Sequence, residues 1–193
     1  MTRRIAIIQG HPDPRGNHFG HALAQAYAQG ATAAGHELRH IEVARLDFPL
    51  LRTREEFENG IPPESIREAQ ETIRWADHLL ILYPLWLGGM PALLKAFLEQ
   101  VFRHGFAMTT EGRGWPKKLL TGKSARIVVT MGMPAFFYRW YFGAHSLKSL
   151  RRNILGFAGI GPIRASLIGT VEGSDTRRQR WMETMRALGR GGR

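Results

Sequence analysis

The segment ILYPLWLGGMPALLKAFLEQVF, residues 81–102, decides the fold class. It begins as an apolar strand, breaks at Pro84, passes Trp86 and two glycines, and then restarts as a helix with a broad apolar stripe. A buried strand that leads through a short loop into an amphipathic helix is the repeating unit of a parallel sheet covered by helices. The segment therefore predicts a parallel sheet with an exposed loop at the end of this strand.

The same alternation extends along the chain on both sides of this segment. Apolar runs predict strands at residues 4–9, 36–43, 78–83, 124–130 and 163–169. Helices are expected at residues 19–34, 63–77, 91–102, 138–157 and 175–188. Residues 44–65 are mostly polar and contain prolines, so we expect an irregular excursion there. The pattern predicts a flavodoxin-like α/β three-layer sandwich with a five-stranded parallel sheet of order 2-1-3-4-5, a single domain over residues 1–193.

Composition limits the chemistry that the protein can perform. The chain has 193 residues, 44% of them hydrophobic, which is enough to bury one full core. It has no cysteine, which excludes disulfides, thiolate metal sites and a cysteine nucleophile. We expect no metal, and redox chemistry would need a borrowed cofactor.

Charge and hydropathy indicate the surroundings and partners of the protein. No apolar run reaches 18 residues and no signal peptide precedes the first strand, so we expect a cytoplasmic protein. The 27 basic against 16 acidic residues give a net charge of +11, which makes a polyanionic partner worth considering. The arginines are scattered, however, and no nucleic-acid-binding motif accompanies them. A basic surface that attracts phosphorylated cofactors is therefore favoured over nucleic acid binding.

Three segments should meet where ligands bind to such sheets, outside the carboxyl ends of the strands. They are GHPDPRGNHFGH at 10–21, YPLWLGGMP at 83–91 and TMGMPAFFY at 130–138. The first contains neither G-x-G-x-x-G nor a Walker loop, yet it leads into a helix start that suits phosphate, with Arg15 among its donors. Trp86 could cover a flat heterocycle beside exposed backbone groups. An ordinary turn and a core tryptophan are the alternatives.

Taken together, these three segments resemble the flavodoxin-like NAD(P)H:quinone oxidoreductases, the family of DT-diaphorase and the bacterial modulator-of-drug-activity reductases. The most specific stretch is YPLWLGGMPALLKAFLEQVFRHGFAM, residues 83–108. The resemblance implies a flavin at the strand ends, FAD with FMN as a possibility, and NAD(P)H as substrate. It also implies a homodimer whose two-fold contact completes the active site. The implied mechanism is ping-pong hydride transfer from NAD(P)H through the flavin to a quinone or similar acceptor.

The resemblance also implies roles for individual residues. Cofactor binding falls to His11, Asn17, His18 and Phe19 for the phosphates, to Pro84, Leu85, Trp86 and Leu87 for the isoalloxazine edge, and to Thr130, Met131 and Gly132 beside the ring. The catalytic candidates, which would hydrogen-bond to the reduced ring, are Tyr138 and His145. The residues expected to line the acceptor pocket are Phe106, Met108, Met133, Phe136 and Phe137.

The sequence departs from the family pattern in places, and other functions stay open. His18 stands where a serine is usual, Gly20 where asparagine is frequent and Met108 where tyrosine is common. The pocket histidine has no counterpart except the nearby His145, which could equally be a surface residue. One alternative is a regulatory ancillary subunit of a potassium efflux system, in peripheral contact with a membrane transporter. A basic nucleic-acid-binding protein is the less favoured alternative.

Overall fold

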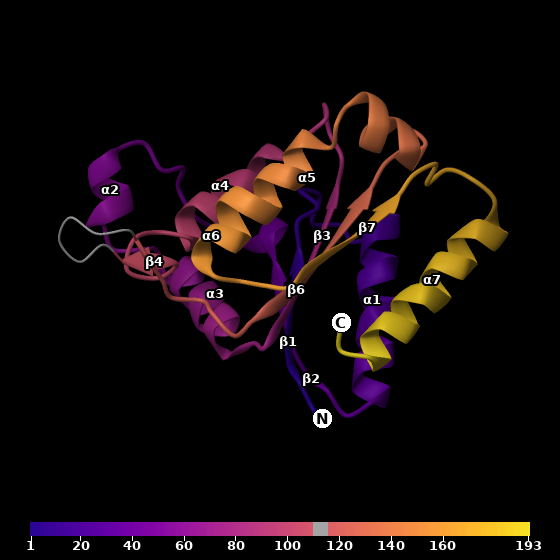
Figure 1. The fold of residues 1–193 in the computed structure, drawn as a ribbon, viewed down its shortest axis with the longest axis horizontal. Helices are drawn as coiled ribbons and strands as arrows, with labels where there is room; N and C mark the ends of the chain where they lie inside the picture. Colours follow the sequence, from indigo (N-terminus) through magenta and orange to yellow (C-terminus); the bar gives the residue numbers. More distant parts are fainter. Residues whose placement is uncertain (110–115) are drawn as a thin grey trace.

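The computed structural model describes residues 1–109 and 116–193, and its centre is a parallel sheet (Figure 1). The strands follow the order β2-β1-β3-β6-β7 and all pair in parallel. Their bounds are β1 Arg4–Gln9, β2 Glu37–Glu42, β3 His78–Pro84, β6 Ser124–Thr130 and β7 Ile163–Ile168. Counted among these five strands alone, the order is 2-1-3-4-5, which confirms the predicted flavodoxin-like fold. A short antiparallel pair, β4 Met108–Thr109 with β5 Lys117–Lys118, was not expected.

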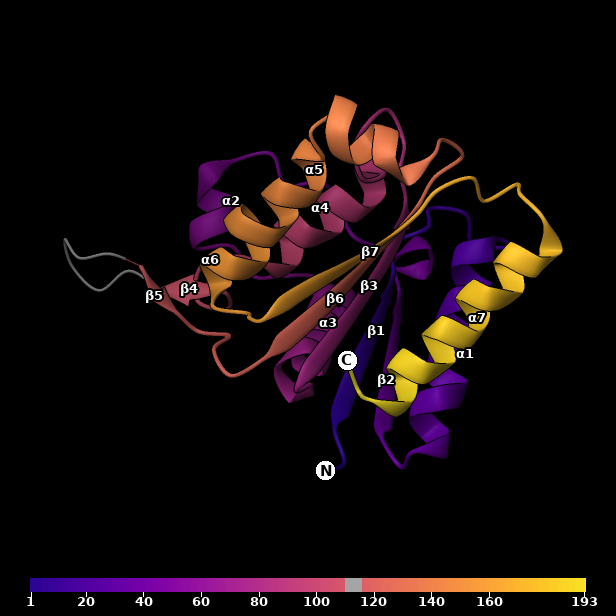
Figure 2. The ribbon, with the colours of Figure 1, turned by 45° about the vertical axis from the view of Figure 1, so that its right-hand side comes forward.

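Helices cover both faces of the sheet and make the three layers (Figure 2). One face carries α1 Phe19–Ala33 and α7 Asp175–Arg190. The other carries α3 Glu64–Trp75, α4 Ala92–Val101 and the segment that contains α5 His145–Ser149. Within the described ranges, no helix is long and apolar enough to cross a membrane.

The core consists of two apolar layers, one on each side of the sheet. The three inner strands are buried along almost their whole length, with Ile5, Ile7 and Leu80 on one face and Ile8 and Ile81 on the other. Burying one such side chain contributes about 1.5–3 kcal/mol relative to leaving it in water. Because both faces of these strands are apolar, polar chemistry is left to the strand ends and to the outer edges of the sheet.

The expected helix at 138–157 is broken in the structure, which corrects that prediction. A π-helical turn, η2 Phe137–Tyr141, is followed by α5, a second π-helical segment, η3 Leu150–Leu155, and α6 Gly156–Ala158. The break lies at Gly143 and Ala144, which have φ of +62° and +47°. Two successive left-handed residues cannot continue a right-handed helix, so the chain changes direction there.

The expected irregular excursion at 44–65 contains two short helical elements. They are a 3₁₀ turn, η1 Val43–Arg45, and α2 Arg54–Glu58. The Thr53 hydroxyl accepts the Glu56 N–H at 3.1 Å, and a Glu56 carboxylate oxygen accepts the Arg52 N–H at 2.8 Å. The sequence Thr-x-x-Glu at 53–56 is a helix-capping signal, so α2 was predictable.

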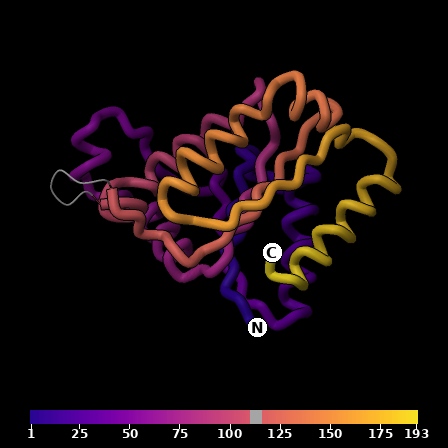
Figure 3. The backbone as a smooth tube through the Cα atoms, viewed as in Figure 1, coloured from indigo at the N-terminus to yellow at the C-terminus, as the bar shows by residue number. Residues whose placement is uncertain are grey.

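The helices α1 and α7 lie side by side (Figure 3), and two glycines allow their close contact. A Cβ placed on Gly30 of α1 would lie 2.0 Å from the carbonyl oxygen of Arg186, and one on Gly189 of α7 would lie 2.1 Å from that of Tyr27. No side chain fits at either position, so the two helix backbones touch. This contact fixes α7 to α1 and thereby sets its distance from the edge strand β7.

We expect Gly189→Ala to lower the free energy of unfolding by about 1–3 kcal/mol, because the added methyl group must separate the two helix backbones. The control is Gly20→Ala, since a Cβ at Gly20 meets no atom within 4 Å and alanine favours a helix. Chemical denaturation of both variants measures the difference. Equal stability of the two variants would contradict the close contact between α1 and α7.

Candidate functional site at the carboxyl ends of the strands

Three loops meet at the carboxyl edge of the sheet: the first loop, residues 10–18, the second loop, residues 84–91, and the third loop, residues 131–136. The Gly10 N–H donates to the carbonyl of Leu82 at 2.7 Å, which joins the end of β1 to β3. The Leu85 N–H donates to the carbonyl of Thr130 at 2.7 Å, which joins the end of β3 to β6. The rings of His11 and Trp86 lie 6.2 Å apart, edge to face, so the first two loops form one surface.

His11, at the end of β1, is held as a neutral hydrogen-bond donor. It is 8% exposed, and burial, assisted by His18 and His21, lowers its pKa to about 4. Its Nδ1 accepts the Asp13 N–H at 3.1 Å, so the ring proton of the neutral form lies on Nε2. The His18 ring stacks on it at 3.8 Å with an interplanar angle of 16°. The first loop therefore presents an imidazole N–H without adding a charge at neutral pH.

Asp13 is the residue of the first loop that sequence reasoning missed. Its carboxylate accepts from Arg15 Nη2 at 2.6 Å and lies 2.8 Å from His18 Nε2. The Arg15 contact holds the pKa of Asp13 well below its usual range. Arg15 and His18, both expected to bind phosphate, are thus already paired with an acid. The signal was an aspartate two residues before Arg15, but only the loop conformation shows that they pair.

The start of α1 leaves backbone donors free for a ligand. His18 occupies the N-cap position but makes no side-chain hydrogen bond to the helix, and no acidic residue stands in the first turn. Such an uncapped helix start carries unsatisfied N–H groups and the positive end of the helix dipole. Asn17 is exposed beside it, and Phe19 is half-buried against the core under α1. This arrangement suits a phosphate group.

The second loop is a tight turn that presents Trp86. Trp86 and Gly89 exchange two backbone hydrogen bonds, of 2.9 and 2.8 Å, around Leu87 at φ +47° and Gly88 at φ +78°. Positive φ at both central residues is the geometry of a type I′ turn. Trp86 is 50% exposed, so the alternative of a core tryptophan is wrong. Leu87, the other side chain at this turn, is fully exposed.

The backbone of the second loop is less open than its sequence suggests. The N–H groups of Leu85 and Trp86 are both used within the chain, by Thr130 and Gly89. Within residues 1–109 and 116–193, the N–H groups of Leu87 and Gly88 have no partner. Donors for a heterocycle are therefore available at the turn itself, two residues later than Leu85 and Trp86.

The third loop is held by the end of β7. Thr130 and Met131 are buried, and the Met131 N–H donates to the carbonyl of Ile168 at 2.9 Å. A Cβ on Gly169 would lie 2.3 Å from the backbone nitrogen of Ala135, so only glycine allows this approach. Gly132 is exposed with open space around its Cα. The loop is therefore fixed, with Gly132 as its accessible backbone.

The two catalytic candidates differ in their exposure to solvent. Tyr138 is 1% exposed, and its hydroxyl oxygen accepts the Leu147 N–H at 3.2 Å, which anchors α5. His145 is exposed at the start of α5, with its ring against Gly143. The Tyr138 O–H proton remains available to an acceptor, but the side chain is covered in this structure.

The structure distributes the residues of the predicted acceptor pocket over three regions. Met133, Phe136 and Phe137 are exposed beside the third loop, and the two phenylalanine rings lie 4.8 Å apart. Phe106 is instead buried with Arg74 over its ring, at the edge where the strands begin. Met108 lines a separate hollow of about 310 Å³ between α2, α4 and η3. One chain therefore does not bring these pocket residues together.

The groups at this edge fit a flavin that carries a phosphate. The uncapped start of α1 suits the phosphate, while Trp86 and the free N–H groups of the turn suit a flat ring with polar atoms at its edge. Behind the first loop, a hollow of about 440 Å³ is lined by Gly16, Gln9 and His21. Gln9 Nε2 and His21 Nδ1 are buried there without a partner in the described part of the chain. Across the same part, no group of three or more His, Asp or Glu residues is arranged to hold a metal.

The buried neutral His11 predicts a pH dependence of stability. Its pKa is about 4 in the folded chain against 6.5 when unfolded, so the unfolded chain binds the extra proton as the pH falls from 6.5 to 4. Stability should fall through that range by up to about 1.4 kcal/mol per pH unit for this group. His11→Gln should make the free energy of unfolding, measured by urea denaturation, depend less steeply on pH between pH 7 and pH 4. The same pH dependence of the free energy of unfolding in the variant and the wild type would contradict a neutral His11.

Comparison with known proteins places the chain in a family. A family model described as having a flavodoxin-like fold matches residues 3–190. An uncharacterized NAD(P)H oxidoreductase of Haemophilus influenzae is 31% identical over 180 residues, which cover 91% of this chain and 88% of the relative. The solved NAD(P)H:quinone oxidoreductase of Methanothermobacter marburgensis has a TM-score of 0.78 and 25% identity, with both chains covered completely.

Two further similarities are more distant. The solved FMN-dependent NADH-azoreductase of Bacillus anthracis, in complex with FMN, has a TM-score of 0.73 at 17% identity and covers 98% of each chain, which shows the shared fold. The ancillary protein KefF of a glutathione-regulated potassium-efflux system from Enterobacter sp. is 31% identical over 128 residues, or 66% of this chain and 60% of that protein. The family model and the Haemophilus relative both extend over nearly the whole chain. The predicted resemblance is thus confirmed, and the chain belongs to the flavodoxin-like family of NAD(P)H oxidoreductases.

Proposed function

We propose that the protein is a flavin-dependent NAD(P)H dehydrogenase that reduces quinones or similar acceptors in the cytoplasm. The observation that carries the proposal is the meeting of an uncapped helix start with an exposed Trp86 and a tight turn at one edge of the sheet. The first feature suits a phosphate and the others suit a flat ring. The Haemophilus and Methanothermobacter relatives, named as an NAD(P)H oxidoreductase and an NAD(P)H:quinone oxidoreductase, support the same activity.

In this proposal the chain binds and orients, and the cofactor reacts. A bound flavin supplies hydride chemistry that the side chains of this protein lack. The first loop and the start of α1 hold its phosphate, and the N–H groups of Leu87 and Gly88 bind the polar edge of its ring. Trp86 forms one wall, and Gly132 allows close approach from the third loop. NAD(P)H and the acceptor occupy the same exposed space in turn, which corresponds to ping-pong kinetics.

The two catalytic candidates take different parts in the proposal. His145 is exposed and offers a polar ring nitrogen at the start of α5. The buried Tyr138 anchors α5 through Leu147, so its proposed hydrogen bond to a bound ring requires that the segment covering it moves. FAD and FMN both carry a phosphate, and in this proposal that phosphate lies in the first loop. The Bacillus neighbour in complex with FMN supports FMN, while the resemblance to DT-diaphorase favours FAD.

We propose that the active unit is a homodimer. The aromatic patch, formed by Phe136, Phe137, Trp140, Tyr141 and Phe142, is exposed next to the third loop. Patches of this kind mark interfaces, and a two-fold contact uses the same patch twice. Because Met108 lies far from the third loop of its own chain, it could line an acceptor pocket only at the site of a partner.

An ancillary role in potassium efflux is the second candidate function. It is favoured by the similarity to KefF, although that similarity covers only 66% of this chain. Such a role needs a peripheral contact with a membrane transporter and is compatible with reductase activity. Nucleic acid binding has no support from the site, because the exposed edge combines a ring-binding turn with a single phosphate position.

The proposed function is tested by the cofactor and by turnover. The purified protein is denatured, and the released cofactor is identified by chromatography and mass. NADPH and NADH oxidation with a benzoquinone is then followed in the steady state. A yellow protein with parallel double-reciprocal plots is the expected result. A colourless protein that neither binds added FMN or FAD nor oxidises NAD(P)H would overturn the proposal.

Trp86 should be the wall that retains the flavin ring. We expect Trp86→Ala to weaken flavin binding by roughly tenfold, because stacking of aromatic rings is worth about 0.5–1.5 kcal/mol beyond burial. Trp86→Phe should retain most of the affinity. Titration of the apoprotein by flavin fluorescence measures both variants. Trp140→Ala is the matched control, and an equal loss in that variant would show that Trp86 has no special role.

The aromatic patch should hold the dimer together. We expect Phe142→Glu to give a folded monomer, because a buried charge without a partner costs more than the interface gains. Its flavin content should largely persist, and its quinone reductase rate should fall at least about tenfold. Sedimentation and steady-state kinetics on one sample provide both readouts. A monomeric variant with wild-type turnover would show that each subunit works alone.

A further inference from the structure

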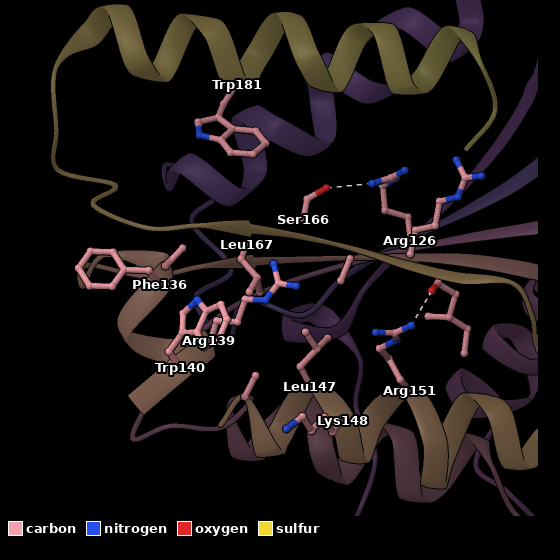
Figure 4. Close-up of a pocket in the computed structure, with 15 residues that line it drawn as sticks. Arg126, Phe136, Arg139, Trp140, Leu147, Lys148, Arg151, Ser166, Leu167 and Trp181 are labelled. Carbon is pink, nitrogen blue, oxygen red and sulfur yellow. Dashed lines mark hydrogen bonds between the residues drawn. The ribbon is translucent and has the colours of Figure 1, made fainter. Parts of the chain in front are cut away.

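A hollow follows the outer edge of β7 and reaches the third loop at one end, where Phe136 and Trp140 of the aromatic patch line it (Figure 4). Its volume is about 1020 Å³. Trp181 of α7 overhangs it on one side, while Leu147 and Lys148 of α5 and Arg151 of η3 form the other wall. We call this hollow the edge groove. Since β7 is the last strand of the sheet, the floor of the edge groove is the unpaired side of a strand.

The backbone of β7 offers hydrogen-bonding groups to the edge groove. The carbonyl groups of Pro162 and Ile168 accept from Ala125 and Met131 of the β6 side at 3.0 and 2.9 Å. Alternate residues of a parallel strand face opposite neighbours, so residues 163, 165 and 167 face outward. Arg151 already binds the carbonyl of Ile163 at 3.2 Å. The outward groups of Ala165 and Leu167 have no partner in the described ranges, which makes them an open template for another strand.

Positive charge lines the edge groove on both faces of the sheet. Arg126 and Arg164 are register partners and lie on the α7 side with Ser166. Lys148 and Arg151 lie on the α5 side, and Arg139 stands at one end. Within the described residues, the lining contains no aspartate or glutamate. These cations are therefore not neutralised by acids in the walls of the edge groove.

Arg126 is the least solvated of these cations. It is 7% exposed, and its Nη1 donates to Ser166 Oγ at 2.9 Å. Its Nε is buried without a partner in the part of the chain that the structure describes. Burial lowers its pKa, and the neighbouring Arg164 and Arg193 lower it further. An anionic group placed here would meet a desolvated guanidinium, where charge-assisted hydrogen bonds are strong.

We propose that the edge groove is a docking site for an extended acidic peptide segment of a partner protein, which adds a sixth strand to β7. A strand directs successive side chains to opposite faces of the sheet. Acidic residues on one face would meet Arg126 and Arg164 on the α7 side. Those on the other face would meet Lys148 and Arg151 on the α5 side. The main chain of the peptide would pair with Ala165 and Leu167. A strand rises ~3.3 Å per residue, with ~4.8 Å between strands and ~10 Å of depth across the sheet, so four residues occupy about 600 Å³. The edge groove, at about 1020 Å³, has room for them. A nucleic acid backbone offers acceptor oxygens but no N–H donors, so it cannot pair with both the N–H and the C=O groups of a strand edge.

The test uses a rhodamine-labelled peptide, acetyl-Thr-Glu-Glu-Val-Glu-Glu-Thr-amide, and the flavin-loaded full chain. This peptide carries two glutamates on each face of a strand. Fluorescence anisotropy at low salt should show saturable binding that weakens by roughly tenfold or more when glutamine replaces the glutamates. Two further peptides are N-methylated at alternate residues, in the two possible phases. One should bind like the parent and the other should fail, because only one phase faces β7.

Variants of the chain separate strand pairing from simple charge attraction. Ala165→Pro removes an outward N–H that the fold does not use, and proline is tolerated at such a position of an edge strand. Arg164→Gln removes one cation from the groove, and Arg54→Gln, on exposed α2, is the charge-matched control. We expect the first two to weaken peptide binding by roughly tenfold each, and the control to bind like the wild type. Flavin content and melting temperature confirm that all three variants are folded.

Several results would overturn the proposal. The first is that the acidic peptide shows no saturable binding. The second is that Ala165→Pro binds the peptide as tightly as the wild type. The third is that Arg54→Gln loses as much peptide affinity as Arg164→Gln. Tighter binding of a single-stranded DNA oligonucleotide that competes with the peptide would assign the edge groove to nucleic acid instead. A change in sedimentation mass caused by Ala165→Pro without peptide would assign it to a second copy of this chain. The flavin and turnover assays are independent of all these outcomes, so failure here does not bear on the proposed reductase activity.

Discussion

The pairing of β3 with β1 on one side and with β6 on the other is the constraint on which the rest of the structure depends. Because these pairings are parallel, the three strands end at the same edge, and their loops must meet there. The hydrogen bonds from Gly10 to Leu82 and from Leu85 to Thr130 continue the pairing up to the loops themselves. Both faces of these strands are covered by helices, so the edge is the place where polar groups can reach a ligand. The position of the site thus follows from the direction of the strands.

Apolar runs were sufficient to predict the five strands, and their alternation with helices predicted the strand order, but neither predicted the path between β6 and β7. That path was expected to contain one continuous helix over residues 138–157. A Gly-Ala pair such as residues 143–144 costs a helix only about 1 kcal/mol, so the sequence alone does not show a break there. The break is determined by tertiary contacts, among them the Leu147 N–H with the Tyr138 hydroxyl. In contrast, α2 was missed although its Thr53–Glu56 cap was visible in the sequence.

The candidate site was predictable where a residue directly follows a strand, as His11 and Trp86 do. Phe106 was placed in the acceptor pocket through the family resemblance alone. It follows α4, which runs back along the sheet from the carboxyl edge, so its position at the opposite edge could have been inferred from the expected fold. The contact of Asp13 with Arg15 and His18 depends on how a nine-residue loop folds, and the hydrophobic pattern of the sequence does not predict a loop conformation. The sequence therefore indicates which loops form the site better than it indicates which groups in them are free.

Net charge is a weak guide to the site because it does not show which charged groups are already paired within the chain. The +11 charge suggests a strongly basic phosphate loop, yet Asp13 offsets Arg15 there, and the phosphate position is left mainly to the start of α1. Along β7 the opposite holds, because Arg126 and Arg164 lie side by side and no acid lines the edge groove within the described residues. Repulsion between neighbouring guanidinium groups costs stability unless an anion offsets it. The same sheet thus separates two kinds of recognition: its strand ends offer helix N–H groups and an aromatic wall to a cofactor, and its outer edge offers main-chain groups and uncompensated positive charge to a partner.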